Sequence, residues 1–183
     1  MKAVVISQPK AGTYLAANLI QYLGMDFSHI HIDPGMYRIF KNNDLKNFER
    51  FGGGVSKAVS NLKDNQFAVG HIPFVKQNKQ ALKDLKKILV IRDIQEIIES
   101  AKRYKEEKDQ DVETIINASN LKNIAQWSKE EDVFVMNFAD MISENSRKIN
   151  EMQMYLFDHI KTDSLWAIRQ AKIAGSLTKS SIR

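Results

Sequence analysis

The chain has 183 residues, and its hydrophobic content of 43% is normal for a soluble globular protein with one core. It contains no cysteine, which excludes disulfides and thiolate metal sites, and it has no apolar run near the ~20 residues that a membrane span needs. The net charge of +5 suits a polyanionic small molecule, nucleic acid or a membrane surface. No signal-peptide core precedes the first apolar run, so we expect a cytoplasmic protein.

The first predicted element is a short buried strand over residues 3–6, which are too few and too β-branched for a helix. Pro9 and Gly12 then indicate a turn. After Gly12, apolar residues recur at helical spacing up to Gly24, a plausible C-terminal stop. A strand–turn–helix unit of this kind directs backbone N–H groups and the positive end of the helix dipole at one point, which attracts an anion, typically phosphate.

The turn itself carries two further groups suited to an anion, the Lys10 ammonium and the Thr13 hydroxyl. It lacks the GxxxxGKS/T spacing of an ATP- or GTP-binding P-loop and the GxGxxG of a dinucleotide-binding turn. An ordinary strand-to-helix turn with an exposed lysine remains the alternative.

A second strand is predicted over residues 29–32, ending at the turn 33–35. Residues 36–54 are polar and mixed, and we expect the glycines at 52–54 to form a mobile hinge or lid rather than a phosphate site. A short helix over 55–62 is expected to follow.

The stretch 67–73 predicts another core strand, which Pro73 stops. His71 therefore lies near the carboxyl end of a strand, at the edge where parallel α/β sheets bind their ligands. A purely structural histidine is the alternative.

An amphipathic helix is predicted over residues 76–87, with its lysines on a solvated face, and the apolar run 88–91 predicts a strand buried on both faces. Arg92 stands at the exit of that strand, and a helix with an apolar face follows over 94–104. An Arg at a strand end can clamp a phosphate in bidentate fashion, whereas a surface ion pair with Asp93 or Glu96 is the alternative.

The last third predicts a charged loop or helix end over 105–113, a helix over 114–127 with Trp127 in the core, and a strand over 133–138. One long helix is then expected to carry an apolar stripe from Ile142 to Ile160. Together these elements predict an α/β fold in a single domain, residues 1–183, with four or five mostly parallel strands and helices on both faces.

Three of these segments resemble motifs of sulfotransferases that use 3′-phosphoadenosine-5′-phosphosulfate (PAPS). Residues 9–15, PKAGTYL, resemble the PKSGTTW phosphate loop, and residues 70–74, GHIPF, resemble the THLP segment. Arg92 and Ser100 have the RxxxxxxxS spacing of the motif for the 3′-phosphate, with Glu96 at its acidic middle position. The three matches occur in the order of that family.

The resemblance implies a fold related to P-loop kinases and a role for each matching residue. His71 is implied as the base and Lys10 as the cation on the leaving oxygen. The loop that holds the 5′-phosphosulfate is implied to consist of Lys10, Ala11, Gly12, Thr13 and Tyr14. Arg92 and Ser100 are implied for the 3′-phosphate, and Phe138 for the neighbourhood of the adenine. No metal is implied.

The sequence also departs from the family pattern. Val69 replaces an auxiliary lysine, and Leu15 replaces a stacking tryptophan. The family's closing RKGxxGxW loop is expected where this chain ends, so Arg183 is implied either to bind the 3′-phosphate alone or to leave the site incomplete.

The function that these matches predict is transfer of a sulfuryl group from PAPS, with PAP (3′-phosphoadenosine-5′-phosphate) as product, to a hydroxyl or amine of a small-molecule or glycan acceptor. One alternative is a degenerate relative that binds PAP or PAPS without transfer. A basic nucleic-acid-binding module is another, motivated by the charge, although the chain shows no recognition-helix pattern and no nucleic-acid partner is expected. A P-loop-like nucleotide kinase is a weaker alternative, because the loop spacing differs.

Overall fold

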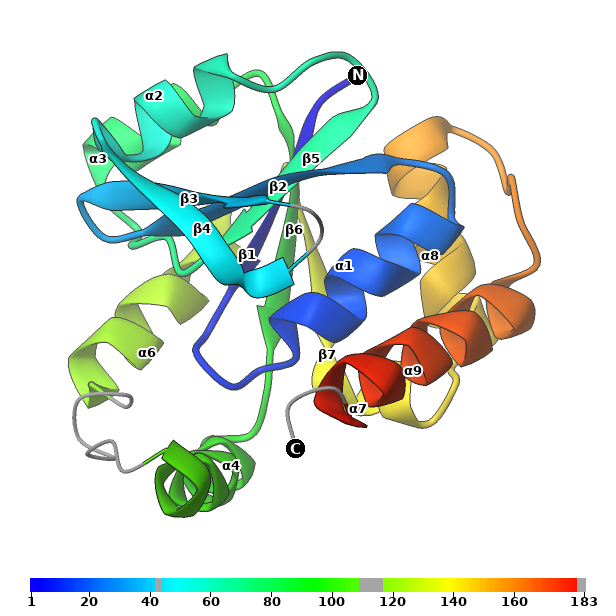
Figure 1. The fold of residues 1–183 in the computed structure, drawn as a ribbon. Coiled ribbons are helices and arrows are strands. Elements are labelled where there is room, and N and C mark those ends of the chain that lie inside the picture. Colours follow the sequence, from blue (N-terminus) through cyan, green and yellow to red (C-terminus); the bar gives the residue numbers. More distant parts are fainter. Residues whose placement is uncertain (42–43, 109–116, 181–183) are drawn as a thin grey trace.

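A computed structural model describes residues 1–41, 44–108 and 117–180 (Figure 1). Its centre is a seven-stranded sheet with the order β4-β3-β2-β5-β1-β6-β7. The strands are β1 Ala3–Ser7, β2 Asp26–Asp33, β3 Met36–Lys41, β4 Asp44–Gly52, β5 Gln66–Gly70, β6 Lys86–Ile91 and β7 Val133–Asn137. The strands β2, β5, β1, β6 and β7 are parallel to their neighbours in this series. The predicted α/β class and mostly parallel sheet are therefore confirmed.

The sheet has more strands than the predicted four or five, because β3 and β4 form an antiparallel hairpin beside β2. Residues 36–54, for which no strand was predicted, therefore contain these two strands, and the glycines at 52–54 that were expected to form a hinge or lid lie at the end of β4 and just after it. Most of β4 is exposed, so it carries no apolar alternation from which a strand could be predicted. The glycines after it have a local role: Gly53 has the left-handed conformation that caps α2, Gly54–Ser60.

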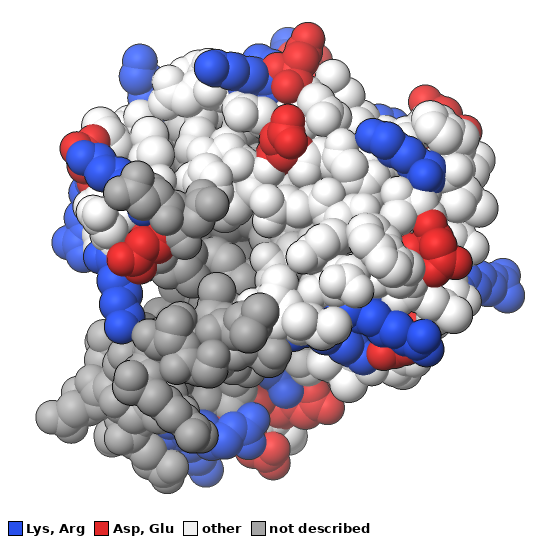
Figure 2. Space-filling model, turned by 45° about the vertical axis from the view of Figure 1, so that its right-hand side comes forward, with Lys and Arg blue, Asp and Glu red and all other residues white. Residues whose placement is uncertain are grey.

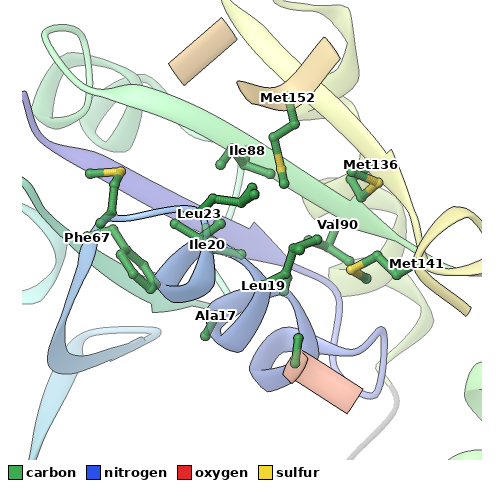
Figure 3. Close-up of a cluster of buried hydrophobic side chains, with 14 of the residues drawn as sticks. Ala17, Leu19, Ile20, Leu23, Phe67, Ile88, Val90, Met136, Met141 and Met152 are labelled. Atoms are coloured by element: carbon green, nitrogen blue, oxygen red, sulfur yellow. The ribbon is translucent and has the colours of Figure 1, made fainter. Parts of the chain in front are cut away.

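One face of the sheet is covered by three helices, α1 Thr13–Tyr22, α8 Ser146–Phe157 and α9 Ser164–Ser180. Alternate residues of the central strands, among them Val5, Val69 and Val90, point into this layer. Figure 3 shows the side chains of Leu19 and Ile20 on α1, and of Leu23 directly after it, packed among Ile88, Met136 and Met152. Because the central strands β5, β1 and β6 are covered on both faces, most of their residues are apolar.

The opposite face is covered by α2, by α6 Ala118–Ala125 and by the 3₁₀ turn η1 Gln126–Lys129. Val4, Ile6 and Leu89 supply the strand side of this second core. Trp127, which is 1% exposed, lies in it and donates its indole N–H to the Ile72 carbonyl at 3.0 Å. The predictions of helices on both faces and of a core Trp127 are confirmed.

Several predicted helices have different bounds in the structure. The helix predicted over 76–87 is only α3, Lys76–Ala81, because Leu82 turns into the core and β6 begins at Lys86 to pair with Ala3. The helix predicted over 94–104 extends further, as α4 Ile94–Lys108.

The long helix predicted after β7 is two helices. These are α7, Phe138–Ile142, and α8, which Asn145 caps by accepting a hydrogen bond from the Lys148 N–H at 3.2 Å. Ile142 and Ile160 are therefore about half exposed and lie outside the core stripe. Within the described part of the chain, no helix combines the length and the apolar character that crossing a membrane requires.

Candidate functional site

The loop from β1 to α1 is a tight turn at the carboxyl edge of the sheet. The Ala11 N–H donates to the Gln8 carbonyl at 3.1 Å, and Lys10 and Gly12 both have left-handed backbones, with φ of 62° and 94°. A Cβ on Gly12 would lie 2.6 Å from the Phe138 ring, so both the backbone angle and the close packing require glycine. The turn feeds directly into the N-terminus of α1, where helix geometry provides no carbonyl for the first amides.

The Thr13 hydroxyl lies on the inner side of this loop. It is buried and hydrogen-bonded to the Ser7 hydroxyl at 2.7 Å. In this conformation Thr13 joins the first turn of α1 to the end of β1, and its hydroxyl is engaged within the protein.

His71 follows β5, the strand beside β1, and its ring reaches the end of β1. Its Nδ1 lies 2.9 Å from the Ser7 carbonyl oxygen. A carbonyl only accepts hydrogen bonds, so Nδ1 carries the proton and the neutral ring keeps Nε2 as an acceptor. Burial lowers the pKa of His71, the Ser7 hydrogen bond and nearby Asp33 oppose that effect, and Arg38 adds to it.

Arg92 follows β6, the strand on the other side of β1, and contacts the same loop. Its Nη1 donates to the Lys10 carbonyl at 3.1 Å, and its guanidinium carbon lies 4.0 Å from the centre of the Phe138 ring. Its Nε also donates to Glu96 at 2.8 Å. Arg92 thus forms the ion pair with Glu96 that was the alternative interpretation. At the same time it makes a hydrogen bond to the β1–α1 loop, which resembles a phosphate-binding loop.

The remaining predicted residues are less closely grouped. Phe138 begins α7 and lies against both Gly12 and Arg92. Ser100 is partly buried on α4, eight residues after Arg92 and about 9 Å along the helix from Ile94. Arg183 lies outside the described residues.

The structure also places in this region several residues that sequence reasoning missed. Gln8 is buried, accepts the Arg92 backbone N–H at 3.3 Å and donates to the Leu121 carbonyl at 3.0 Å. His31 and Asp33 were also missed, and they form a further polar group beside His71 together with Tyr14, which was predicted as part of the loop. The alternation His–Ile–His–Ile–Asp over 29–33 could have indicated a polar strand face, but not its partners.

The placement of these residues follows from the topology. β5, β1 and β6 are adjacent and parallel, so Lys10, His71 and Arg92 meet at the same edge. The chain after β1 turns to the face covered by α1, whereas after β5 it turns to the opposite face, where Ile72 is buried. Such a switch point is where open α/β sheets bind ligands. Among the described residues, no group of three or more His, Asp and Glu side chains is arranged to hold a metal.

No family model matches the sequence, and no curated protein matches it. The fold nevertheless matches solved structures. The chain aligns with the mouse sulfotransferase SULT7A1 complexed with PAP at a TM-score of 0.59 and 12% identity, over 93% of this chain and 63% of that one. It aligns with retinol dehydratase in complex with androsterone and inactive cofactor PAP at a TM-score of 0.61 and 11% identity, over the same two fractions.

The chain therefore has the fold of the sulfotransferases. It spans about 63% of the length of these two neighbours.

Proposed function

We propose that this protein binds PAPS and transfers its sulfuryl group to a hydroxyl or amine of a small-molecule or glycan acceptor. The observation that carries this proposal is the convergence on the β1–α1 loop. His71 contacts the end of β1, where the loop begins, through the Ser7 carbonyl, and Arg92 contacts the loop through the Lys10 carbonyl. The two PAP-bound structures of the same fold support the choice of nucleotide.

The residues at this edge fit a doubly phosphorylated nucleotide. The N-terminus of α1 favours negative charge, and Lys10 and Arg92 bring two cations to the same loop. The guanidinium has five N–H donors, and its hydrogen bonds to Glu96 and the Lys10 carbonyl occupy one on Nε and one on Nη1. Arg92 and Ser100 are proposed for the 3′-phosphate, with Phe138 as the platform below the guanidinium.

His71 is proposed as the base that removes the acceptor proton. Its Nδ1 proton is held by the Ser7 carbonyl, so Nε2 remains to take a proton. The lowered pKa keeps the ring neutral near pH 7, which is the state that a base requires. PAPS, when bound, supplies the activated sulfuryl group, and Lys10 is proposed to neutralise charge on the leaving phosphate.

The test compares two substitutions that this assignment separates. His71→Ala should lower PAPS turnover about 10²-fold or more and leave PAP affinity nearly unchanged, because a base acts on the acceptor. Arg92→Ala should weaken PAP binding by roughly 2–4 kcal/mol, because it removes a charged phosphate ligand. Turnover is measured as PAP release with a panel of phenol, sugar and amine acceptors, and affinity by calorimetry.

Two substitutions serve as matched controls. His159→Ala changes an exposed histidine, and Arg147→Ala removes an exposed Arg paired with a Glu four residues on, as Arg92 is paired with Glu96. Neither control should alter affinity or turnover. Equal loss of PAP binding in His71→Ala would show a structural histidine, and unchanged affinity in Arg92→Ala would refute the 3′-phosphate assignment.

A second candidate is a nucleotide-binding protein without transfer. It is favoured by Val69, which is fully buried in the core where the resembling family has an auxiliary lysine. This candidate predicts PAP binding with no PAP release from PAPS across the acceptor panel.

A further inference from the structure

A polar group lies beside His71 and has no part in the reaction proposed above. Its centre is His31 on β2, whose side chain is only 4% exposed. The Tyr14 hydroxyl, from the first turn of α1, lies 2.9 Å from His31 Nδ1. Asp33 approaches the other ring nitrogen, with 3.5 Å between its Oδ1 and Nε2, and is itself held by Arg38 through two hydrogen bonds of 2.7 and 3.0 Å.

The contacts of this ring follow from its place on the sheet. His31 pairs with Val69 across β2 and β5, so its side chain lies on the face that α1 covers. The backbone N–H of His71 donates to the backbone carbonyl of Ile32 at 3.0 Å, so His71 lies next to the strand that carries His31. Their ring centres are 5.2 Å apart, with the planes at 74°.

The charge state of His31 is fixed by its surroundings. Burial lowers its pKa to about 2, and His71 and Arg38 act in the same direction. The ring is therefore neutral and has one N–H and one acceptor. With the Tyr14 O–H donating to Nδ1, the ring proton lies on Nε2, which makes no hydrogen bond within the described part of the chain although Asp33 Oδ1 is 3.5 Å away.

We propose that His31 is a positioning residue for His71. Its ring holds the His71 imidazole with Nδ1 on the Ser7 carbonyl, and its bond to Tyr14 ties that imidazole to the first turn of α1. The position of the His71 ring relative to the β1–α1 loop is thereby fixed, although the two follow different strands. This inference rests on the proposed function for its catalytic consequence, and its structural part stands independently.

The experiment uses substitutions that each remove a different contact of the His31 ring. His31→Phe keeps an aromatic ring and removes both nitrogens, whereas His31→Asn keeps a polar atom near the position of Nδ1 and so can retain the bond to Tyr14. Tyr14→Phe removes only the hydroxyl. The primary measurement is a long-range ¹H–¹⁵N spectrum of the imidazoles in the protein without nucleotide, which reports the tautomer of His71 independently of activity.

In the wild type we expect a single His71 tautomer with the proton on Nδ1. His31→Phe and Tyr14→Phe should each produce a mixture of tautomers, because the ring that packs against His71 is then no longer tied to α1, and His31→Asn, which keeps that tie but lacks the ring, should produce a mixture as well. PAPS turnover should fall about tenfold or more in His31→Phe, with PAP affinity within about twofold of the wild type. That split between turnover and binding is not expected from a general loss of structure.

A folded His31→Phe variant with the wild-type His71 spectrum would overturn the inference. If His31→Phe does not fold, Tyr14→Phe decides in its place, and an unchanged spectrum there also overturns it. Absence of PAP binding by the wild type would instead refute the proposed function. The His71 spectra would still test the positioning role of His31.

Discussion

At the residue scale, two histidines with lowered pKa values make stability depend on pH. Burial lowers the pKa of His31 from 6.5 to about 2, and burial also lowers the pKa of His71. Below pH 6.5 the unfolded chain therefore binds protons that the folded chain does not, so the free energy of unfolding falls as pH falls. Each histidine should contribute a slope of up to about 1.4 kcal/mol per pH unit, and that of His31 persists down to about pH 2.

The measurement is denaturant unfolding at several pH values between 7 and 5, above the range in which ordinary carboxylates titrate. His31→Phe should reduce the slope by the contribution of one histidine, whereas His159→Ala, at an exposed position, serves as the control. The same slope in the wild type and in His31→Phe would mean that His31 is protonated in the folded protein.

At the element scale, the β1–α1 loop depends on Gly12. Alanine there has to adopt a φ of 94°, which costs about 1–2 kcal/mol, and its Cβ would meet the Phe138 ring on which Arg92 lies. We expect Gly12→Ala to lower PAP affinity about tenfold or more and to destabilise the protein by about 1–3 kcal/mol. Calorimetry and denaturant unfolding measure the two effects.

Gly35→Ala is the matched control. Gly35 also has a positive φ, 77°, but nothing lies within 4 Å of its Cβ position. It should lose about 1 kcal/mol of stability and leave PAP affinity unchanged. Equal affinity in Gly12→Ala and the wild type would show that the shape of this loop is irrelevant to the nucleotide.

The elements that could be predicted from the sequence are those whose apolar pattern reflects burial on both faces. The strands at 3–6, 67–73 and 88–91 have this pattern because they are the central parallel strands of the sheet. The hairpin of β3 and β4 has no such pattern, since its outer strand is solvated, and no local rule marks it. The break between α7 and α8 depends on Asn145 as a cap, a signal that the continuous apolar stripe obscured.

The candidate site likewise contains residues that the sequence could predict and residues that it could not. Lys10, His71 and Arg92 were predictable because each stands at the end of a recognisable strand, and such ends share one edge. The bond between Tyr14 and His31 joins residues on two elements, and the His31–His71 contact depends on the register of β2 against β5. Register and side-chain packing of that kind come from the tertiary structure and have no counterpart in sequence spacing.

At the scale of the whole molecule, the distribution of charge bears on the nucleic-acid alternative. Figure 2 shows Lys and Arg interleaved with Asp and Glu over the visible face rather than gathered into a stripe. Several of these cations are paired; Lys172 and Arg169, for example, both contact Glu144. On the described part of this face the cations therefore do not form the single-sign stripe that is typical of a nucleic-acid-binding surface.

The central claim is that the edge formed by β5, β1 and β6 is a site for a nucleotide with phosphates at both the 3′ and 5′ positions. The most direct measurement is the melting temperature with PAP, with AMP, which lacks the 3′-phosphate, and with ATP as controls. At 100 times its dissociation constant PAP should stabilise the protein by about 2.7 kcal/mol, a rise of about 5 °C or more, and the controls should give much smaller shifts. Equal shifts with the three nucleotides, or none with PAP, would contradict the account.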